Sequence, residues 1–265
     1  MTIGFIGCGN MGGAIARAVY EKTGGSCLYL ADAQQKKAQA LADCLNAKAV
    51  SNEQAALCDF VFLGVKPQHI GALLDSLRDT LASRQDSFVL ITMVAGYEMA
   101  QIQQKLGLNA PVIRIMPNTP VFVGEGLIAY CAGEQVSKAQ KEAFVSLMQY
   151  AGMLDEIPET MIDAASCVSG CGPAWAYQMI EALADGGVAC GMPRDKAYAY
   201  AAQMLVGSGK MVLQKKDHPA ALKDQVCSPG GSTIQGVRVL EERGFRGAVM
   251  DAVIAAYEKT KLLGK

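Results

Sequence analysis

Three glycines close to the N-terminus have a spacing suited to holding phosphate groups. Gly7, Gly9 and Gly12 form a G-x-G-x-x-G pattern after the apolar segment 3–6 and before a helical pattern. The first glycine allows a tight turn, the second lets the backbone approach a pyrophosphate, and the third lets helix and strand pack closely. The N–H groups and positive dipole end of the helix would face the phosphates. Because the motif joins a strand to a helix, it predicts dinucleotide binding rather than an ordinary glycine-rich turn.

Asp32 follows Gly12 by twenty residues, at the end of the second predicted strand. A carboxylate at this position commonly accepts a hydrogen bond from the adenosine ribose 2′-hydroxyl, which favours NAD. Lys36 and Lys37 lie just beyond it and could instead contact a 2′-phosphate. A helix N-cap is the structural alternative for Asp32. The sequence therefore leaves the choice between NADH and NADPH open.

A second glycine-rich turn, 228–233, reads Ser-Pro-Gly-Gly-Ser-Thr and precedes the helical pattern 234–242. A helix N-terminus with two hydroxyls and small residues is an anion site suited to a substrate carboxylate. Simple capping by Ser232 or Thr233 is the alternative.

The sequence offers little acid–base machinery. Neither His69 nor His218 lies in a strand–loop setting typical of a general base, and no Ser-His-Asp set or paired carboxylates emerge. Hydride addition to a carbon–nitrogen double bond fits this composition, because a protonated imine is already electrophilic. A ketone would instead need its oxygen protonated as the hydride arrives.

The elements that position these turns alternate in type through the first half of the chain. Apolar segments at 3–7, 28–32, 60–65, 89–94 and 112–116 predict buried strands, with helical patterns between them. Such alternation predicts a mostly parallel sheet covered on both faces, and 126–131 and 153–157 predict further strands. Ligands bind beyond the carboxyl ends of such strands. We therefore expect the turns at 65–68, 94–96 and 116–120, including Asn118, near a nicotinamide, although each could be a rigid surface turn.

After about Pro158 only helical patterns follow, at 174–189, 195–213 and 247–262. The predicted fold class is therefore α/β. It has an N-terminal Rossmann-like, mostly parallel sheet domain at 1–158 and a C-terminal all-helical domain at 159–265. Apolar residues such as Tyr198, Tyr200, Met204 and Leu205 cover more than one helix face. A small bundle cannot bury them alone, so the helical domain is predicted to form a homodimer interface.

Composition excludes several classes of partner. The 265 residues carry a net charge of −1, which gives no electrostatic footprint for nucleic acid or an anionic membrane. The longest apolar runs are too short to span a bilayer, and no signal peptide is evident, so a cytoplasmic location is expected. Nine scattered cysteines without a C-x-x-C pair, and only two histidines, predict reduced thiols and no metal site.

Motifs along the whole chain resemble those of the pyrroline-5-carboxylate reductase family. They are the segments 7–12, 65–67, 116–120, 169–174 and 224–233, the last followed by a helix ending in Leu240-Glu241. The resemblance implies NAD(P)H as reductant, 1-pyrroline-5-carboxylate as substrate and L-proline as product, in the last step of proline biosynthesis. It also implies a helical domain that dimerises, with dimers often assembling into decamers.

The resemblance also implies roles for individual positions. Ser232, Thr233 and the amides of Gly230 and Gly231 would hold the substrate carboxylate. Thr233 would hydrogen-bond the ring nitrogen and is the candidate catalytic residue. The predicted cofactor contacts, with Gly12, Asp32 and Asn118 added from the reasoning above, are Ile6, Gly7, Cys8, Gly9, Asn10, Met11, Gly12, Asp32, Asn52, Gly64, Val65, Lys66, Pro67, Met93, Val94, Ala95 and Asn118.

Two departures from the family pattern affect these expectations. Relatives often carry a polar pair, including Arg or Ser, after the second strand, where this chain has Ala31-Asp32; NADPH preference is therefore in question. The segment 214–219 has lysine where relatives tend to carry glutamate.

Two other functions are compatible with parts of the sequence. A 3-hydroxyacid dehydrogenase would need a lysine on the helix after the Ser-Gly turn, but segment 175–179 has none and the next lysine is Lys196. A non-catalytic dinucleotide-binding regulator would need the fold but not the turn at 228–233.

Overall fold

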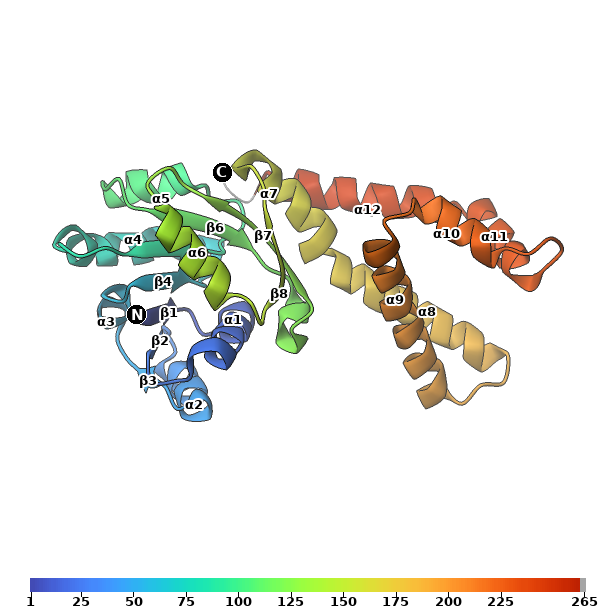
Figure 1. Ribbon diagram of the computed structural model, residues 1–265, viewed down its shortest axis with the longest axis horizontal. Helices are drawn as coiled ribbons and strands as arrows, with labels where there is room; N and C mark the ends of the chain where they lie inside the picture. Colours follow the sequence, from blue (N-terminus) through green and yellow to red (C-terminus); the bar gives the residue numbers. More distant parts are fainter. Residues whose placement is uncertain (263–265) are drawn as a thin grey trace. The chain divides into compact units, whose positions relative to one another are not determined.

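The computed structural model describes residues 1–262, which form two compact units (Figure 1). Unit 1 comprises Met1–Cys171 together with the chain from Ala256 onward, and unit 2 comprises Gly172–Ala255. The boundary expected at 158/159 precedes α7 (Glu159–Ala165) and the π-helix η2 (Ser166–Gly170), both of which belong to unit 1.

Unit 1 is built on an eight-stranded sheet with the order β3-β2-β1-β4-β5-β6-β7-β8. All neighbouring strands are parallel except β6 and β7, which confirms the predicted mostly parallel sheet. The strands are β1 (Ile3–Ile6), β2 (Leu28–Ala31), β3 (Lys48–Ala49), β4 (Phe60–Leu63), β5 (Val89–Thr92), β6 (Val112–Met116), β7 (Gly126–Ala132) and β8 (Gly152–Glu156).

Helices bury both faces of this sheet (Figure 1). One face packs against α1 (Asn10–Thr23), α2 (Gln35–Leu45) and α6 (Lys138–Leu147), and the other against α3 (Asn52–Ala56), α4 (Pro67–Ala82) and α5 (Met99–Leu106). On β4, Phe60 and Phe62 point to the first face, and Val61 and Leu63 to the second. The Phe62 ring stacks on that of Phe5, with ring centroids 4.5 Å apart. Burial on both faces explains why these strands read as unbroken apolar runs.

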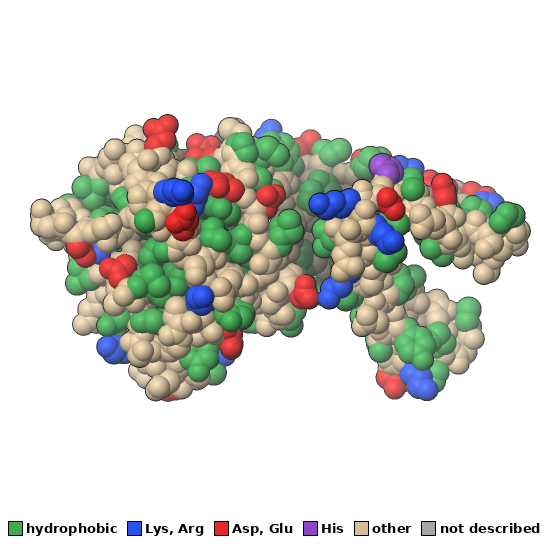
Figure 2. Space-filling view, in the orientation of Figure 1, with side chains coloured by type: hydrophobic (Ala, Val, Ile, Leu, Met, Phe, Trp, Pro, Cys, Tyr) green, Lys and Arg blue, Asp and Glu red, His purple; other side chains and the backbone are tan. Residues whose placement is uncertain are grey.

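Every regular element after Pro158 in the described residues is a helix. Unit 2 contains α8 (Gly172–Ala189), α9 (Arg194–Lys215), α10 (Pro219–Val226), α11 (Ser232–Glu242) and most of α12 (Phe245–Thr260), and α8 packs against α9. No residue of α10, α11 or α12 is buried within the described chain. Hydrophobic side chains such as Tyr200 and Leu213 are exposed on the helices of unit 2. Figure 2 shows hydrophobic side chains on the surface of these helices.

No helix in the described part of the chain is long and apolar enough to cross a membrane.

Candidate functional site

The turn after β1 depends on glycine at two positions for steric reasons. Gly7 has a φ of +104°, and a Cβ atom there would lie 2.6 Å from the Gly64 carbonyl at the end of β4. A Cβ atom on Gly12 would lie 2.0 Å from the Gly7 carbonyl oxygen. Real Cβ atoms do not approach so closely, so these two glycines let α1 and β4 pack directly against the turn.

Gly9 is different, because a Cβ atom placed on it would meet no described atom within 4 Å. Gly9 is the N-cap residue of α1, and no side chain caps this helix end within the described chain. The N–H groups of the first turn of α1 are therefore available to a ligand, as is the positive end of the helix dipole. Open space beside uncapped amides fits a pyrophosphate.

Asp32 follows β2, and backbone donors hold both oxygens of its carboxylate. Its Oδ2 accepts a hydrogen bond from the Cys8 N–H and its Oδ1 accepts one from the Gln34 N–H, each at 2.8 Å. The N-cap of α2 is Gln34, so Asp32 does not cap this helix in the way that the sequence left open. Asp32 instead joins the glycine turn to the start of α2.

Cys8 lies inside the glycine turn, and its thiol is held in the neutral form. Burial and the neighbouring charge of Asp32 raise the pKa of this thiol to about 12. The Sγ donates to the Ala31 carbonyl oxygen at 3.4 Å. Because reactions of cysteine need the thiolate, Cys8 is a packing residue of this turn rather than a nucleophile.

A cavity of about 520 Å³ lies along the carboxyl ends of β1, β2 and β4. Ligands of open α/β sheets bind at this edge. The cavity brings together eight of the predicted cofactor residues, namely Ile6, Gly7, Gly9, Asp32, Asn52, Gly64, Val65 and Lys66. The cavity is also lined by residues that were not predicted as cofactor contacts, namely Ala33, Gln34, His69, Ala72, Leu73 and Ser76. The last four recur at three- and four-residue spacing along α4, a signal that could have identified the wall.

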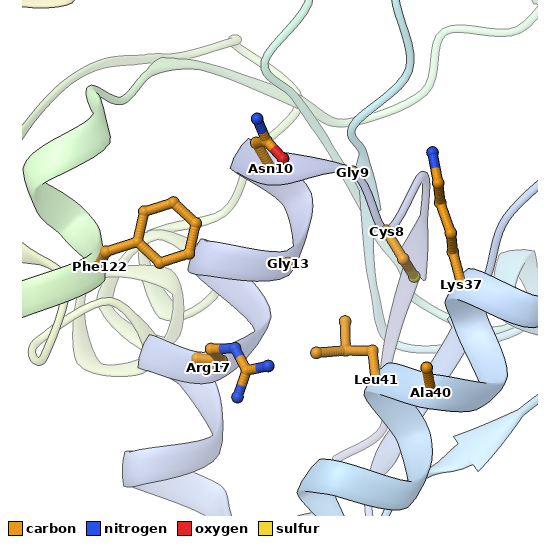
Figure 3. Close-up of a pocket in the computed structure, with 9 residues that line it drawn as sticks. All are labelled: Cys8, Gly9, Asn10, Gly13, Arg17, Lys37, Ala40, Leu41 and Phe122. Atoms are coloured by element: carbon orange, nitrogen blue, oxygen red, sulfur yellow. The ribbon is translucent and has the colours of Figure 1, made fainter.

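A second cavity, of about 340 Å³, adjoins the first at the glycine turn (Figure 3). Gly9 and Lys37 line both cavities. In Figure 3 the Lys37 side chain extends from α2 beside the loop that carries Cys8 and Gly9. Asn10, another predicted cofactor residue, also lines this cavity. Lys37 is therefore the lysine next to the turn, whereas Lys36 lines neither cavity.

The other predicted cofactor residues line neither cavity in the described part of the chain. They are Met11, Gly12, Pro67, Met93, Val94, Ala95 and Asn118. Asn118 holds structure together: its Nδ2 donates to the Ser169 carbonyl oxygen at 3.0 Å, and its Oδ1 accepts from the Leu127 N–H at 2.9 Å. These bonds attach the turn after β6 to β7 and to η2.

A buried arginine on β6 anchors the chain that leads toward unit 2. Arg114 Nη2 lies 2.6 Å from Asp163 Oδ1, and its Nη1 lies 3.4 Å from Glu159 Oε1, with both carboxylates on α7. Glu159 Oε1 also accepts a hydrogen bond from the Met99 N–H at 2.8 Å. Glu159 of α7 thus links Arg114 on β6 to the start of α5, which follows the predicted nicotinamide loop. An arginine inside an apolar strand is the sequence signal that could have indicated this anchor.

The predicted substrate turn lies in unit 2. Gly230 has a φ of +72°, and the Gly231 N–H donates to the Ser228 carbonyl oxygen at 3.0 Å, which closes the turn. Gly231 is the N-cap of α11, and the helix begins at Ser232. Because the N-cap residue has no side chain, neither Ser232 nor Thr233 occupies the capping position that was the alternative. Both hydroxyl residues are exposed at the first turn of α11.

A doubly wound sheet with an open glycine turn at the carboxyl end of β1 defines a dinucleotide-dependent protein of the Rossmann type. Comparisons with known proteins agree with this class. Residues 2–96 match a family described as NADP oxidoreductase, coenzyme F420-dependent, and residues 159–263 match the pyrroline-5-carboxylate reductase dimerisation family.

Full-length relatives identify the family. A pyrroline-5-carboxylate reductase from Escherichia coli is 39% identical over 99% of this chain and 98% of its own length. Pyrroline-5-carboxylate reductase 3 from Xenopus laevis is 36% identical over 100% of this chain and 97% of its own. The crystal structure of Plasmodium falciparum pyrroline carboxylate reductase with NADP bound superposes with a TM-score of 0.89, at 33% identity over 100% of this chain and 98% of that one. The chain belongs to the pyrroline-5-carboxylate reductase family.

Proposed function

We propose that this protein reduces the carbon–nitrogen double bond of 1-pyrroline-5-carboxylate with NAD(P)H and yields L-proline, the last step of proline biosynthesis. The observation that carries the proposal is the full-length relationship to pyrroline-5-carboxylate reductases. The cavity at the glycine turn, which gathers eight predicted cofactor residues, supports a dinucleotide as the reductant. When bound, the reduced nicotinamide supplies a hydride to the imine carbon.

The chain's own residues have two tasks in this reaction. The amides and hydroxyls at the start of α11 bind the substrate carboxylate, because they combine free N–H groups with a positive dipole end. Thr233 orients the ring nitrogen by a hydrogen bond. A strong general acid is not required, since a protonated imine already accepts a hydride, and the nitrogen keeps its proton as the amine forms.

Oxidation of the reduced cofactor tests the proposal directly. The protein is mixed with 1-pyrroline-5-carboxylate and either NADPH or NADH, and the loss of absorbance at the nicotinamide band is followed. We expect oxidation that depends on the imine, with proline as the product. Oxidation only with a β-keto acid would instead indicate a hydroxyacid dehydrogenase, and binding without turnover would indicate a regulator.

Substitution of Thr233 tests its catalytic role. We predict that Thr233→Ala lowers kcat by at least about tenfold, the scale of one lost charge-assisted hydrogen bond. Thr233→Ser, which keeps the hydroxyl, should retain most of the activity, and Thr233→Val, which keeps the shape, should not. Steady-state kinetics with 1-pyrroline-5-carboxylate measures all three. Turnover at the wild-type rate in the alanine variant would refute this role.

We further propose that unit 2 forms a homodimer and that dimers assemble further into decamers. Support comes from the match to a dimerisation family and from the apolar side chains that α8–α12 leave exposed. Exposed apolar area on this scale is typical of an interface between subunits. Sedimentation at micromolar concentration should show a dimer or a larger assembly, and a stable monomer would contradict the proposal. A cytoplasmic location is also proposed, because all nine cysteines are free, as is usual in a reducing compartment.

A further inference from the structure

We infer that Asp32 makes NADH, rather than NADPH, the preferred reductant of this protein, an inference that rests on the proposed function. Asp32 lines the cavity at the carboxyl ends of β1 and β2, together with Gly7 and Gly9 of the glycine turn. In Rossmann folds this is the position that contacts the adenosine ribose, at the carbon that carries a hydroxyl in NADH and a phosphate in NADPH.

The carboxylate of Asp32 is fixed in place by two hydrogen bonds. Its two oxygens accept hydrogen bonds from the Cys8 and Gln34 N–H groups, at 2.8 Å each. A rotation that moved the charge away from a phosphate would break both bonds and leave two backbone donors without a partner. Each oxygen nevertheless keeps a second acceptor site, so the carboxylate can still accept a hydrogen bond from a ribose 2′-hydroxyl.

The same two bonds remove the donors that a 2′-phosphate would need. A phosphate at the end of β2 would be stabilised by backbone N–H groups of the neighbouring turns, as phosphates are in other glycine-rich sites. Here the Cys8 and Gln34 N–H groups already bind Asp32. A phosphate would therefore meet a fixed negative charge and find its nearest donors occupied.

Two basic residues close to the turn do not reverse this balance. Lys37 lines the cavity with Asp32, but it is an exposed, flexible side chain with one positive charge. A phosphate monoester carries between one and two negative charges at neutral pH, so Lys37 cannot offset both the phosphate and Asp32. Arg17 lines the adjoining cavity (Figure 3), but its Nη1 lies 3.2 Å from Cys44 Sγ in the gap between α1 and α2. Lys37 therefore reduces the preference for NADH over NADPH, but Asp32 determines that NADH is the preferred cofactor.

The test compares the two reductants in two independent measurements on the full chain. The first is kcat/KM for NADH and for NADPH with saturating 1-pyrroline-5-carboxylate. The second is the Kd of each reduced dinucleotide without any imine, from the change in nicotinamide fluorescence on binding. We expect the wild-type protein to favour NADH by at least about tenfold in both. A preference for NADPH in the binding measurement would overturn the inference, whatever the substrate proves to be.

Variants assign the preference to the carboxylate. Asp32→Ser removes the charge and keeps a short hydrogen-bond acceptor. It should lower the ratio of kcat/KM for NADH to kcat/KM for NADPH at least tenfold. Lys37→Gln should raise the ratio, because it removes the cation that favours a phosphate. Asp43→Ser is the matched control, since Asp43 is exposed on α2 and lies outside both cavities, and it should leave the ratio unchanged. An unchanged ratio in a folded Asp32→Ser protein would also overturn the inference.

The binding measurement separates this inference from the proposed function. If the protein reduces no pyrroline-5-carboxylate with either cofactor but still binds NADH more tightly, the proposed function fails and the assignment of Asp32 stands. If the imine is reduced with NADPH as the better cofactor, the proposed function stands and the assignment of Asp32 fails. If the Asp32→Ser protein does not fold, the comparison of NADH and NADPH on the wild-type protein still shows which cofactor is preferred.

Discussion

Alanine at Gly9 is expected to leave the protein as stable as the wild type and to weaken dinucleotide binding by at least about tenfold. A Cβ atom on Gly9 meets no described atom within 4 Å, and the residue has a φ of −69°, which alanine adopts without strain. The added methyl would occupy the space into which a pyrophosphate must come to reach the first N–H groups of α1. A tenfold loss corresponds to about 1.4 kcal/mol of binding free energy.

Gly12→Ala is the matched variant in the same turn, and it should lower the stability that Gly9→Ala leaves unchanged. Its Cβ atom would lie 2.0 Å from the Gly7 carbonyl oxygen. Backbone atoms cannot move aside as a flexible side chain can, so α1 must shift away from β1. We expect a loss of about 2–3 kcal/mol in the free energy of unfolding, the upper part of the range for overpacking. Displacement of the helix end should also weaken dinucleotide binding.

Urea denaturation without cofactor measures the free energy of unfolding of both variants, and nicotinamide fluorescence measures their affinity for the dinucleotide. The pair of variants therefore distinguishes a glycine needed by the ligand from a glycine needed by the fold. Normal NADH and NADPH affinity in the Gly9→Ala protein would show that the pyrophosphate does not lie over this turn. A Gly12→Ala protein with wild-type stability would show that α1 can move without penalty.

Much of unit 1 could be predicted because its strands are specified by short, continuous segments of the sequence. The apolar runs of β1, β4, β5 and β6 are buried on both faces, and each is too short for a helix, so their length and their β-branched and aromatic residues indicated strands. The two-residue strand β3 was not predicted, because Lys48 and Ala49 carry no strand pattern and are held only by pairing with β2. Such an edge strand depends on its neighbour rather than on its own residues.

The site was predictable where a motif specifies backbone geometry and less so where it depends on side chains from other elements. Gly7, Gly9 and Asp32 share one cavity, as expected. Asn118 was expected beside the nicotinamide, and the structure shows its amide bonded to Leu127 and Ser169. Ser169 lies 51 residues from Asn118 in the sequence, so no local pattern could indicate this partner. The wall from α4 was missed although its residues recur at helical spacing, because that spacing does not show that this face of α4 lines a cavity.

In the helical half, the sequence predicted the helices but not what they pack against. The helices were predictable from periodicity, but their partners were not, because so few of their apolar side chains are buried within one chain. The sequence signal, apolar residues on several faces of α9, indicates a second subunit without specifying its position.

Replacing Arg114 by methionine should destabilise unit 1 by about 3 kcal/mol, the low end of the range for breaking a buried ion pair. The Arg114 side chain is only 2% exposed, and its removal leaves Glu159 and Asp163 facing a site without a positive charge. These carboxylates are about a quarter exposed, which reduces the penalty. The loss of Nε, which has no hydrogen-bond partner among the described residues, reduces it further. Methionine keeps much of the volume, so the measured change reports the charge rather than a cavity.

Urea denaturation of three proteins measures this effect and its origin. Arg78→Met is the control, because Arg78 pairs with Asp75 at 3.1 Å while both side chains are about half exposed. Exposed pairs contribute less than about 1 kcal/mol, so this variant should stay close to the wild type. In the double variant Arg114→Met with Asp163→Asn, part of the lost stability should return, since one unpaired carboxylate has been removed. If Arg114→Met is no less stable than Arg78→Met, the ion pairs do not anchor α7 to the sheet.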